Sequence, residues 1–302
     1  MELTFESVPV RGGDLAVGRA GPPVGSSDVP VVVAAHGITA SALGWLRVAE
    51  LAGDELTLLA PDLRGRGLSA GLPAPFGIDA HVQDLFAVLD HHGLHDATFV
   101  GHSMGAYVVA QAAATHPERV GAAVLVDGGF PLPVPEGADV DAVLDATLGP
   151  AIARLSETYD DLDAYLAFWR QHPAFSGLDA DDERLLERYV AHDLDPATGR
   201  SRVASEPVRA DGRDLLVGPG PRTALGRLRC PTWLVRAPRG MFDDPDAPLV
   251  PLAAAESLVG DHPGFRLRTV EDTNHYTILM TTRGASAVLD AVRAAVRTAS
   301  PA

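Results

Sequence analysis

Residues 99–107 read FVGHSMGAY, with one serine between two glycines. An apolar run stops at Gly101, Ser103 follows two residues later, and Gly105 precedes an apolar run with helical spacing. Glycine on both sides of a serine allows a sharp turn from a strand into a helix. Such a turn lifts the hydroxyl off the edge of a sheet and sets it beside free N–H groups at a helix start. We therefore interpret Ser103 as a nucleophile.

Strands and helices alternate on both sides of this turn, as in a mostly parallel sheet covered by helices. Buried strands are predicted from short apolar runs at 31–35, 56–60, 97–100, 122–126, 232–236 and 265–270, after a strand pair at 3–10 and 14–20. Helices are predicted at 42–51, 79–91, 106–115 and 285–298. The pattern predicts the α/β fold class, with a doubly wound, mostly parallel sheet of about eight strands.

The alternation is interrupted after the strand at 122–126. Residues 131–221 contain many acids, helical stretches at 140–155, 162–171 and 183–191, and no convincing strand. We interpret 131–221 as a helical cap inserted after the sixth strand of the sheet. The core domain then consists of residues 1–130 and 222–302.

Composition limits the partners and the compartment of the chain. Its 302 residues carry a net charge of −16, which disfavours binding to nucleic acid or to anionic membranes. No apolar run reaches transmembrane length, and the amino terminus lacks the basic and apolar regions of a secretion signal. The one cysteine, Cys230, excludes an intrachain disulfide, and we expect it to be buried and structural. We expect a cytoplasmic protein that binds a small molecule, and its oligomeric state is left open.

A serine hydroxyl needs a base to become a nucleophile, and His275 has the best position for that role. It follows the strand at 265–270 after a short loop and precedes the last helix, which places it at the same edge of the sheet as Ser103. Seven other histidines are interpreted as surface or capping residues: His91, His92, His95, His116, His172, His192 and His262.

The segment His36-Gly37-Ile38 ends the strand at 31–35 on the same edge of the sheet. We predict that the N–H groups of Ile38 and Met104 hold the oxyanion that forms when Ser103 attacks a carbonyl group. The His36 side chain is expected to shape this loop by hydrogen bonding and to stay outside the chemistry.

With these motifs in place, the chain resembles the α/β-hydrolase family. The resemblance covers nearly the whole length and rests on four motifs in order: HG at 36–37, DLRGRGLS at 62–69, GHSMG at 101–105 and NH at 274–275. It implies the α/β-hydrolase fold with a cap after the sixth strand. It also implies that DLRGRGLS is a structural loop, so that Asp62 and Arg64 do not take part in catalysis.

The acid that orients His275 is harder to assign. In most of the family it follows the seventh strand in a G-x-x-D pattern, but here that position is Gly240. Asp243 or Asp244 of the same loop is one solution, and Asp127 after the sixth strand is the other. The chain resembles haloalkane dehalogenases with a sixth-strand acid, which have Glu at the position of Asp127 and Asp as nucleophile. We predict Asp127, with Asp243 or Asp244 as the alternative.

The pattern predicts a serine hydrolase of carboxylic esters, lactones or related acyl compounds, with a small-molecule acyl substrate and no metal or organic cofactor. A C–C bond hydrolase or thioesterase with the same triad is an alternative, as is a ligand-binding protein of this fold with little turnover. Substrate choice is expected to depend on the cap and the loops beneath it. The candidate lining residues are Trp45, Phe130, Phe168, Trp169 and Phe175.

Overall fold

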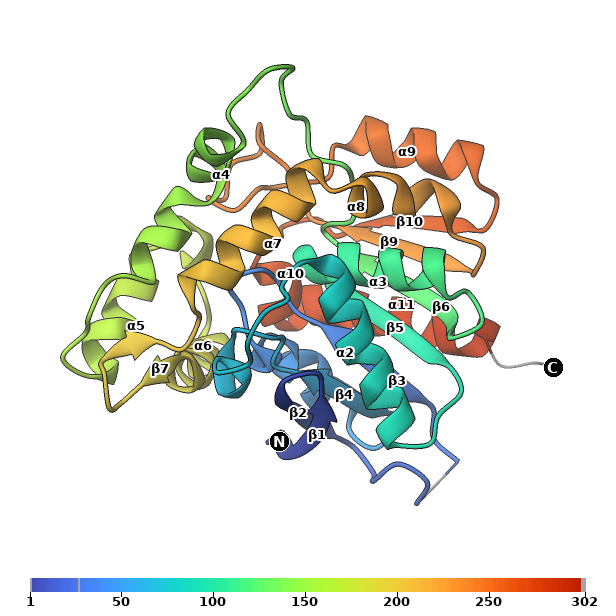
Figure 1. Cartoon of the computed structure of the whole chain (residues 1–302), viewed down its shortest axis with the longest axis horizontal. Helices are drawn as coiled ribbons and strands as arrows, with labels where there is room; N and C mark the ends of the chain where they lie inside the picture. The colour runs from blue at the N-terminus through green and yellow to red at the C-terminus, as the bar shows by residue number, and fades with distance from the viewer. Residues whose placement is uncertain (1, 27, 300–302) are drawn as a thin grey trace.

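The apolar runs of the sequence form one main sheet in the computed structural model, which describes residues 2–26 and 28–299. Residues 1, 27 and 300–302 of the predicted core domain lie outside the described residues. The strand order is β1-β2-β4-β3-β5-β6-β9-β10 (Figure 1). The strands are β1 (Thr4–Val10), β2 (Gly13–Ala20), β3 (Val31–Ala35), β4 (Thr57–Pro61), β5 (Ala97–His102), β6 (Val120–Val126), β9 (Thr232–Arg236) and β10 (Phe265–Thr269). β2 runs antiparallel to both neighbours and the sheet is parallel from β4 to β10, which confirms the predicted fold class.

Both faces of this sheet are covered by helices, which explains why its strands read as continuous apolar runs. On β5, Phe99 packs with residues of α2 (Ile78–His91) and α3 (Met104–Thr115). Its neighbour Val100 packs with residues of α1 (Leu46–Ala52) and α11 (Thr282–Ala299) on the opposite face. Helix α9 (Leu252–Asp261) lies against β10. Figure 1 shows α2 and α3 in front of the sheet and α11 behind it.

The chain between β6 and β9 is largely helical, as predicted. It contains α4 (Val140–Arg154), α5 (Leu162–Arg170), α6 (Ala180–Asp193), α7 (Ser205–Val217) and α8 (Pro219–Ala224). The prediction that this segment holds no strand was wrong, because β7 (Leu194–Asp195) and β8 (Arg200–Ser201) form a small antiparallel hairpin. Strands of two residues are too short to give a periodic pattern. Helix α8 crosses the predicted boundary at residue 221, and the division into core and cap stays a prediction.

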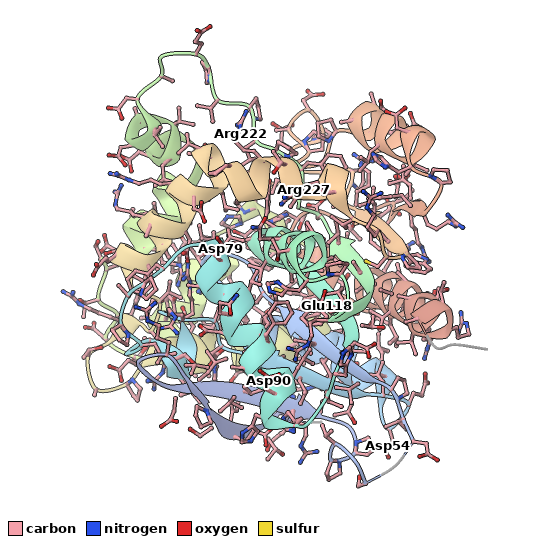
Figure 2. All side chains as sticks on the ribbon, turned by 45° about the vertical axis from the view of Figure 1, so that its right-hand side comes forward. Asp54, Asp79, Asp90, Glu118, Arg222 and Arg227 are labelled. Carbon is pink, nitrogen blue, oxygen red and sulfur yellow. The ribbon has the colours of Figure 1, made fainter. Side chains whose placement is uncertain are left out.

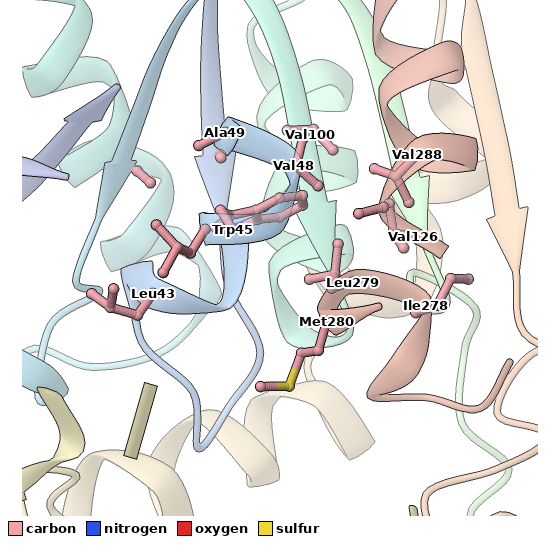
Figure 3. Close-up of a cluster of buried hydrophobic side chains, with 14 of the residues drawn as sticks. Leu43, Trp45, Val48, Ala49, Val100, Val126, Ile278, Leu279, Met280 and Val288 are labelled. Carbon is pink, nitrogen blue, oxygen red and sulfur yellow. The ribbon is translucent and has the colours of Figure 1, made fainter. Parts of the chain in front are cut away.

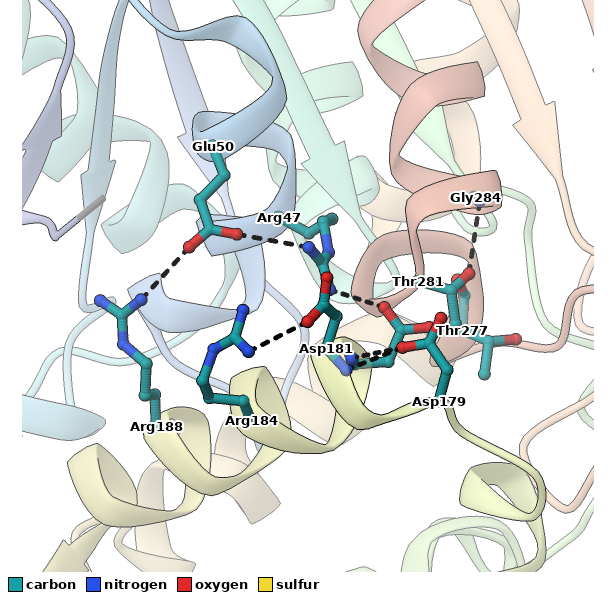
Figure 4. Close-up of polar contacts among 10 residues, drawn as sticks. Arg47, Glu50, Asp179, Asp181, Arg184, Arg188, Thr277, Thr281 and Gly284 are labelled. Carbon is teal, nitrogen blue, oxygen red and sulfur yellow. Dashed lines mark hydrogen bonds and ion pairs between the residues drawn. The ribbon is translucent and has the colours of Figure 1, made fainter.

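Buried and partly buried polar contacts hold this helical segment against the sheet domain. Arg47 of α1 donates to the carboxylate of Asp182 on α6 at 2.7 Å, and both side chains are largely buried. Figure 4 shows Glu50 of α1 between Arg47 and Arg188, with distances of 3.4 and 3.3 Å. Helix α6 is therefore held against α1 by charges from both elements.

The acidic composition is distributed over the outer surface. Figure 2 shows exposed acids such as Asp54, Asp79, Asp90 and Glu118 on loops and helix ends around the sheet. Within the part of the chain that the structure describes, no helix is both long and apolar enough to cross a bilayer.

Candidate active site

Ser103 lies in a strained turn between β5 and α3. Its backbone has φ 54° and ψ −120°, a left-handed conformation that is unusual for a residue with a side chain. A Cβ at Gly101 would lie 2.1 Å from the carbonyl oxygen of Gly105, and a Cβ at Gly105 would lie 2.0 Å from that of Ala35. Both flanking glycines are therefore required by close backbone approach, and the turn presents Ser103 at the edge of the sheet.

His275 and Asp127 come together at this edge from segments far apart in the sequence. His275 Nδ1 donates to Asp127 Oδ2 at 2.7 Å, and the residues are only 4% and 1% exposed. Asp127 has a left-handed φ of 43°, and its Oδ1 accepts from the backbone N–H of Ala237 at 3.0 Å. With Nδ1 protonated toward the carboxylate, the Nε2 of His275 is left to accept a proton.

The two alternative acids have other partners. Asp243 Oδ1 accepts from the side-chain amide of Asn274 at 3.0 Å and forms an ion pair with Arg239 at 3.1 Å. Asp244 Oδ1 accepts from the backbone N–H of Asp246 at 2.8 Å. The structure thus brings Asp127, and neither Asp243 nor Asp244, into hydrogen-bond contact with His275.

The loop after β3 is held by the buried side chain of His36. Its Nδ1 donates to the carbonyl oxygen of Gly37 at 2.7 Å, and its Nε2 accepts from the N–H of Leu63 at 2.9 Å. Burial lowers the pKa of His36 to about 3, so the imidazole is neutral and bridges the two segments. Ile38 and Met104, the predicted oxyanion donors, line the same cavity as Ser103 and His275.

A buried arginine fixes the peptide unit that follows Ile38. Arg66 Nε donates to the carbonyl oxygen of Ile38 at 2.9 Å, and Arg66 Nη1 pairs with Asp211 of α7 at 2.5 Å. Asp211 also contacts His81 Nε2 at 2.9 Å. Burial raises the pKa of Asp211, but Arg66 and His81 outweigh it and hold the pKa below its usual range. Sequence reasoning missed this cluster, because its members are far apart in the chain.

The loop DLRGRGLS has the structural contacts that the resemblance implies. Asp62 accepts from the backbone N–H groups of Ala42 and Leu68, both at 2.8 Å. Its Oδ2 also contacts His192 Nε2 at 2.8 Å, so His192, which was predicted to be a surface or capping residue, is a mostly buried partner of this loop in the last turn of α6.

His102 is a residue of the site that sequence reasoning did not single out, although it lies inside GHSMG. Its Nε2 donates to the backbone carbonyl of His275 at 2.8 Å, and the two ring centroids are 4.6 Å apart. Burial holds the pKa of His102 well below the usual range for histidine. A neutral His102 therefore supports the backbone of His275 without adding a charge next to it.

Ser103, Asp127 and His275 line a cavity of about 130 Å³. Its other walls are mainly apolar and come largely from α4, α7 and the loop after β9, with Leu144, Leu148, Leu215, Leu216, Met241 and Leu249 among them. Polar groups are few, as is usual for a small-molecule site. In residues 2–26 and 28–299, no group of three or more His, Cys, Asp or Glu side chains is arranged to hold a metal ion.

The predicted aromatic lining was mostly wrong. Trp45 is 0% exposed and packs inside the hydrophobic core, beside Val48 and Val100 (Figure 3). Phe130 does not line the cavity; its carbonyl oxygen accepts from Tyr107. Trp169 and Phe168 line a neighbouring cavity instead, and Phe175 packs against Trp169. Many of the walls around Ser103 are leucines on helices, such as Leu144, Leu148, Leu215 and Leu216, which no local sequence signal distinguishes from core leucines.

An elbow serine beside a buried His–Asp pair, on a sheet of this strand order, defines the class of protein. The chain belongs to the α/β-hydrolase fold family, whose model matches residues 30–279. It is 40% identical over 135 residues to lipase LipV of Mycobacterium tuberculosis, covering 45% of this chain and 48% of that protein. It is 30% identical over 234 residues to epoxide hydrolase A of the same organism, covering 76% of this chain and 64% of that protein.

The chain thus spans about half to just under two thirds of the length of these curated relatives. Among solved structures, E-2-(acetamidomethylene)succinate hydrolase is similar with a TM-score of 0.76 and 20% identity, covering 98% of this chain and 99% of that one. The thioesterase domain from the curacin biosynthetic pathway is similar with a TM-score of 0.72 and 20% identity, covering 96% and 100%. At this identity the structural likeness shows the fold.

Proposed function

We propose that the chain is a serine hydrolase of carboxylic esters, lactones or related acyl compounds. The observation that carries this proposal is the 2.7 Å contact between His275 Nδ1 and Asp127 in the cavity that Ser103 lines. A carboxylate on Nδ1 fixes the tautomer in which Nε2 accepts a proton, and a serine in this setting is an acyl-transfer nucleophile.

The proposed reaction begins when Ser103 Oγ attacks the substrate carbonyl carbon and His275 Nε2 takes the hydroxyl proton. The N–H groups of Ile38 and Met104 bind the oxyanion of the tetrahedral intermediate. His275 then protonates the leaving alcohol as the C–O bond breaks, which leaves an acyl group on Ser103. Water, deprotonated by His275, attacks the acyl-enzyme and releases the acid with Ser103 restored.

The relatives support a hydrolase but differ in the bonds they cleave, since their names include a lipase, an epoxide hydrolase and a deformylase. The serine at the elbow and the mainly apolar cavity favour acyl substrates with an apolar body. The bond type within the acyl class and the location of the protein in the cell stay predictions from the sequence.

The first test is the steady-state hydrolysis of p-nitrophenyl acetate and butyrate. Ser103→Ala should lower kcat by at least about 10³, because the remaining groups cannot form an acyl-enzyme. Ser257→Ala, an exposed serine of α9, is the matched control and should leave kcat unchanged. Retention of more than about a tenth of the rate by Ser103→Ala would show that another group is the nucleophile.

A second measurement separates an enzyme from a ligand-binding protein with the same residues. Continuous turnover after the first equivalent of product supports the enzyme. Release of one equivalent followed by a stop would indicate a protein that is acylated but does not turn over. Turnover is also expected to survive EDTA, and its loss with recovery by a divalent ion would contradict the serine mechanism.

A further inference from the structure

A second cavity of about 70 Å³ adjoins the one that holds Ser103; we call it the side chamber. Both cavities are lined by Thr39, Thr147, Leu148, Ala151, Met241 and Tyr276. Thr39 follows the oxyanion donor Ile38, and Tyr276 follows His275. Residues next to the oxyanion donor and next to His275 therefore also border the side chamber.

Aromatic rings form most of the side chamber that is not shared with the reaction site. They belong to Phe168, Trp169, His172 and Phe242, with Tyr276 at the shared boundary. His172 stacks on Phe242 with ring centroids 5.2 Å apart and meets Tyr276 edge-on at 5.3 Å. Phe168 and Phe242 remain 38% and 48% exposed. Exposed rings around a cavity are typical of a binding surface, since a core aromatic such as Trp45 is buried completely.

The side chamber also contains an arginine, but its charge is already paired. Arg154 Nη1 bonds to Asp193 at 2.7 Å, Nη2 donates to the carbonyl oxygen of Thr39 at 3.3 Å, and only 3% of the side chain is exposed. Its guanidinium lies 4.9 Å from the centre of the Trp169 ring. Burial lowers the pKa of His172, which keeps that ring neutral at neutral pH. The walls therefore offer aromatic faces and edges, and no free cation for an anionic ligand.

We propose that the side chamber binds a neutral aromatic group of the substrate, so that the chain prefers aryl-bearing esters or lactones over saturated ones of the same size. This inference rests on the proposed function, because it names the substrate class of the same site. Ring–ring contacts add about 0.5–1.5 kcal/mol beyond the burial of apolar area. The expected preference is therefore about 2- to 12-fold in kcat/KM.

The test uses matched ester pairs that differ only in ring saturation, followed by titration of the released acid. Methyl 3-phenylpropanoate and methyl 3-cyclohexylpropanoate place the ring in the acyl half. Benzyl acetate and cyclohexylmethyl acetate place it in the alcohol half. A preference for the aromatic member of at least one pair supports the proposal.

Variants connect this preference to the side chamber. Phe242→Leu and Phe168→Leu keep an apolar side chain but remove the ring, and each should bring the aryl-to-cyclohexyl ratio closer to one. Phe76→Leu makes the same change outside both cavities and should leave the ratio as in the wild type. An unchanged ratio in both chamber variants would overturn the proposal, and unchanged melting temperatures show that the variants are folded.

The remaining outcomes separate this inference from the proposed function. Equal rates within both pairs, with hydrolysis still dependent on Ser103, would overturn the side-chamber proposal and leave the serine hydrolase intact. A preference for methyl 3-(4-carboxyphenyl)propanoate over its neutral parent would overturn it too, because Arg154 would then act as an anion receptor. If no ester is hydrolysed, calorimetry of 3-phenylpropanol and 3-cyclohexylpropanol with Ser103→Ala tests the side chamber alone. Tighter binding of the aromatic alcohol supports the proposal, and equal binding overturns it.

Discussion

The ends of β6 and β9 are neighbours in the sheet, but the aspartates that follow them differ in burial and in their polar partners. Asp127 directly follows β6, is buried, and has one hydrogen-bond donor on each carboxylate oxygen. Asp243 lies several residues beyond β9, is about a third exposed, and pairs with Arg239. The end of β9 contributes the N–H of Ala237, which holds the carboxylate of Asp127. Asp127 is therefore held by the backbone of the neighbouring strand end and shielded from water, whereas Asp243 is not.

The loop after β9 contributes to the cavities near Ser103. In this loop Asp243 and Asp244 have partners other than His275, and Met241 and Phe242 line the cavities near Ser103. Gly240 is packed so tightly that a Cβ there would lie 2.1 Å from the carbonyl oxygen of Ala247. The usual acid position of the family is thus closed to side chains in this chain.

The largest effect is expected from Asp127→Asn. The amide cannot stabilise a charged His275 and favours the wrong tautomer, so kcat should fall by about 10⁴ in the ester assay. The exposed Asp90→Asn on α2 is the control for the same chemical change and should keep kcat. A loss smaller than about tenfold in a folded Asp127→Asn protein would contradict the assignment of the acid.

His36, which directly follows β3, is a buried group that the fold keeps neutral. The unfolded chain protonates His36 near pH 6.5, whereas burial holds its pKa at about 3 in the folded protein. Below pH 6.5 only the unfolded chain gains this proton. The free energy of unfolding therefore decreases by about 1.4 kcal/mol for each unit by which the pH is lowered. Denaturant unfolding between about pH 6.5 and pH 4 should show a flatter pH dependence in His36→Gln than in the wild type. Equal slopes for the two proteins would mean that His36 does not stay neutral in the fold.

Gly240→Ala tests whether position 240, in the loop after β9, has room for a side chain. The added methyl must displace the backbone near Ala247, so the free energy of unfolding should drop by about 1–3 kcal/mol. Gly260→Ala on α9 has open space around it and should leave stability equal or improved. The same crowding predicts that Gly240→Asp will not restore activity to Asp127→Asn. Recovery of the rate in that double variant would show that β9 can also carry the acid.

The smallest effect is expected from Asp243→Asn. Its ion pair with Arg239 is partly exposed and contributes about 1 kcal/mol or less to stability, and its carboxylate does not contact His275, so kcat/KM should stay close to that of the wild type. Asp244→Asn should behave in the same way. If the Asn variant of Asp243 or Asp244 were as inactive as Asp127→Asn, the acid would have to be assigned to the loop after β9.

Local sequence patterns were sufficient to predict those parts of the molecule whose conformation depends on local steric contacts. The glycines around Ser103 predict the elbow, because only glycine fits against the backbone there. Short apolar runs predict the strands of the sheet, because these are buried on both faces. The end of the strand predicted at 122–126 also pointed to Asp127, although the sequence alone left Asp243 and Asp244 open.

Features that depend on tertiary packing were not predictable in this way. Helix α7 contains Gly212 in its interior, which disfavours a helix locally, and it forms because Val208, Leu215 and Leu216 are buried. Trp45 and most of the cavity leucines are apolar residues in helical segments, and only the fold decides which of them face the site. The contacts of His102 and Arg66 join residues distant in sequence, so no local motif predicts these contacts.

The ion pair between Arg66 and Asp211 has a consequence for protein engineering. Arg66 belongs to the sheet domain and Asp211 to the helical segment, and both side chains are completely buried at 2.5 Å from each other. A buried charge that loses its partner costs about 3–5 kcal/mol. The helical segment is therefore not an interchangeable module. A chimera that receives the corresponding helices of a relative must bring an acid for Arg66, or replace Arg66 as well, to keep the carbonyl of Ile38 in place.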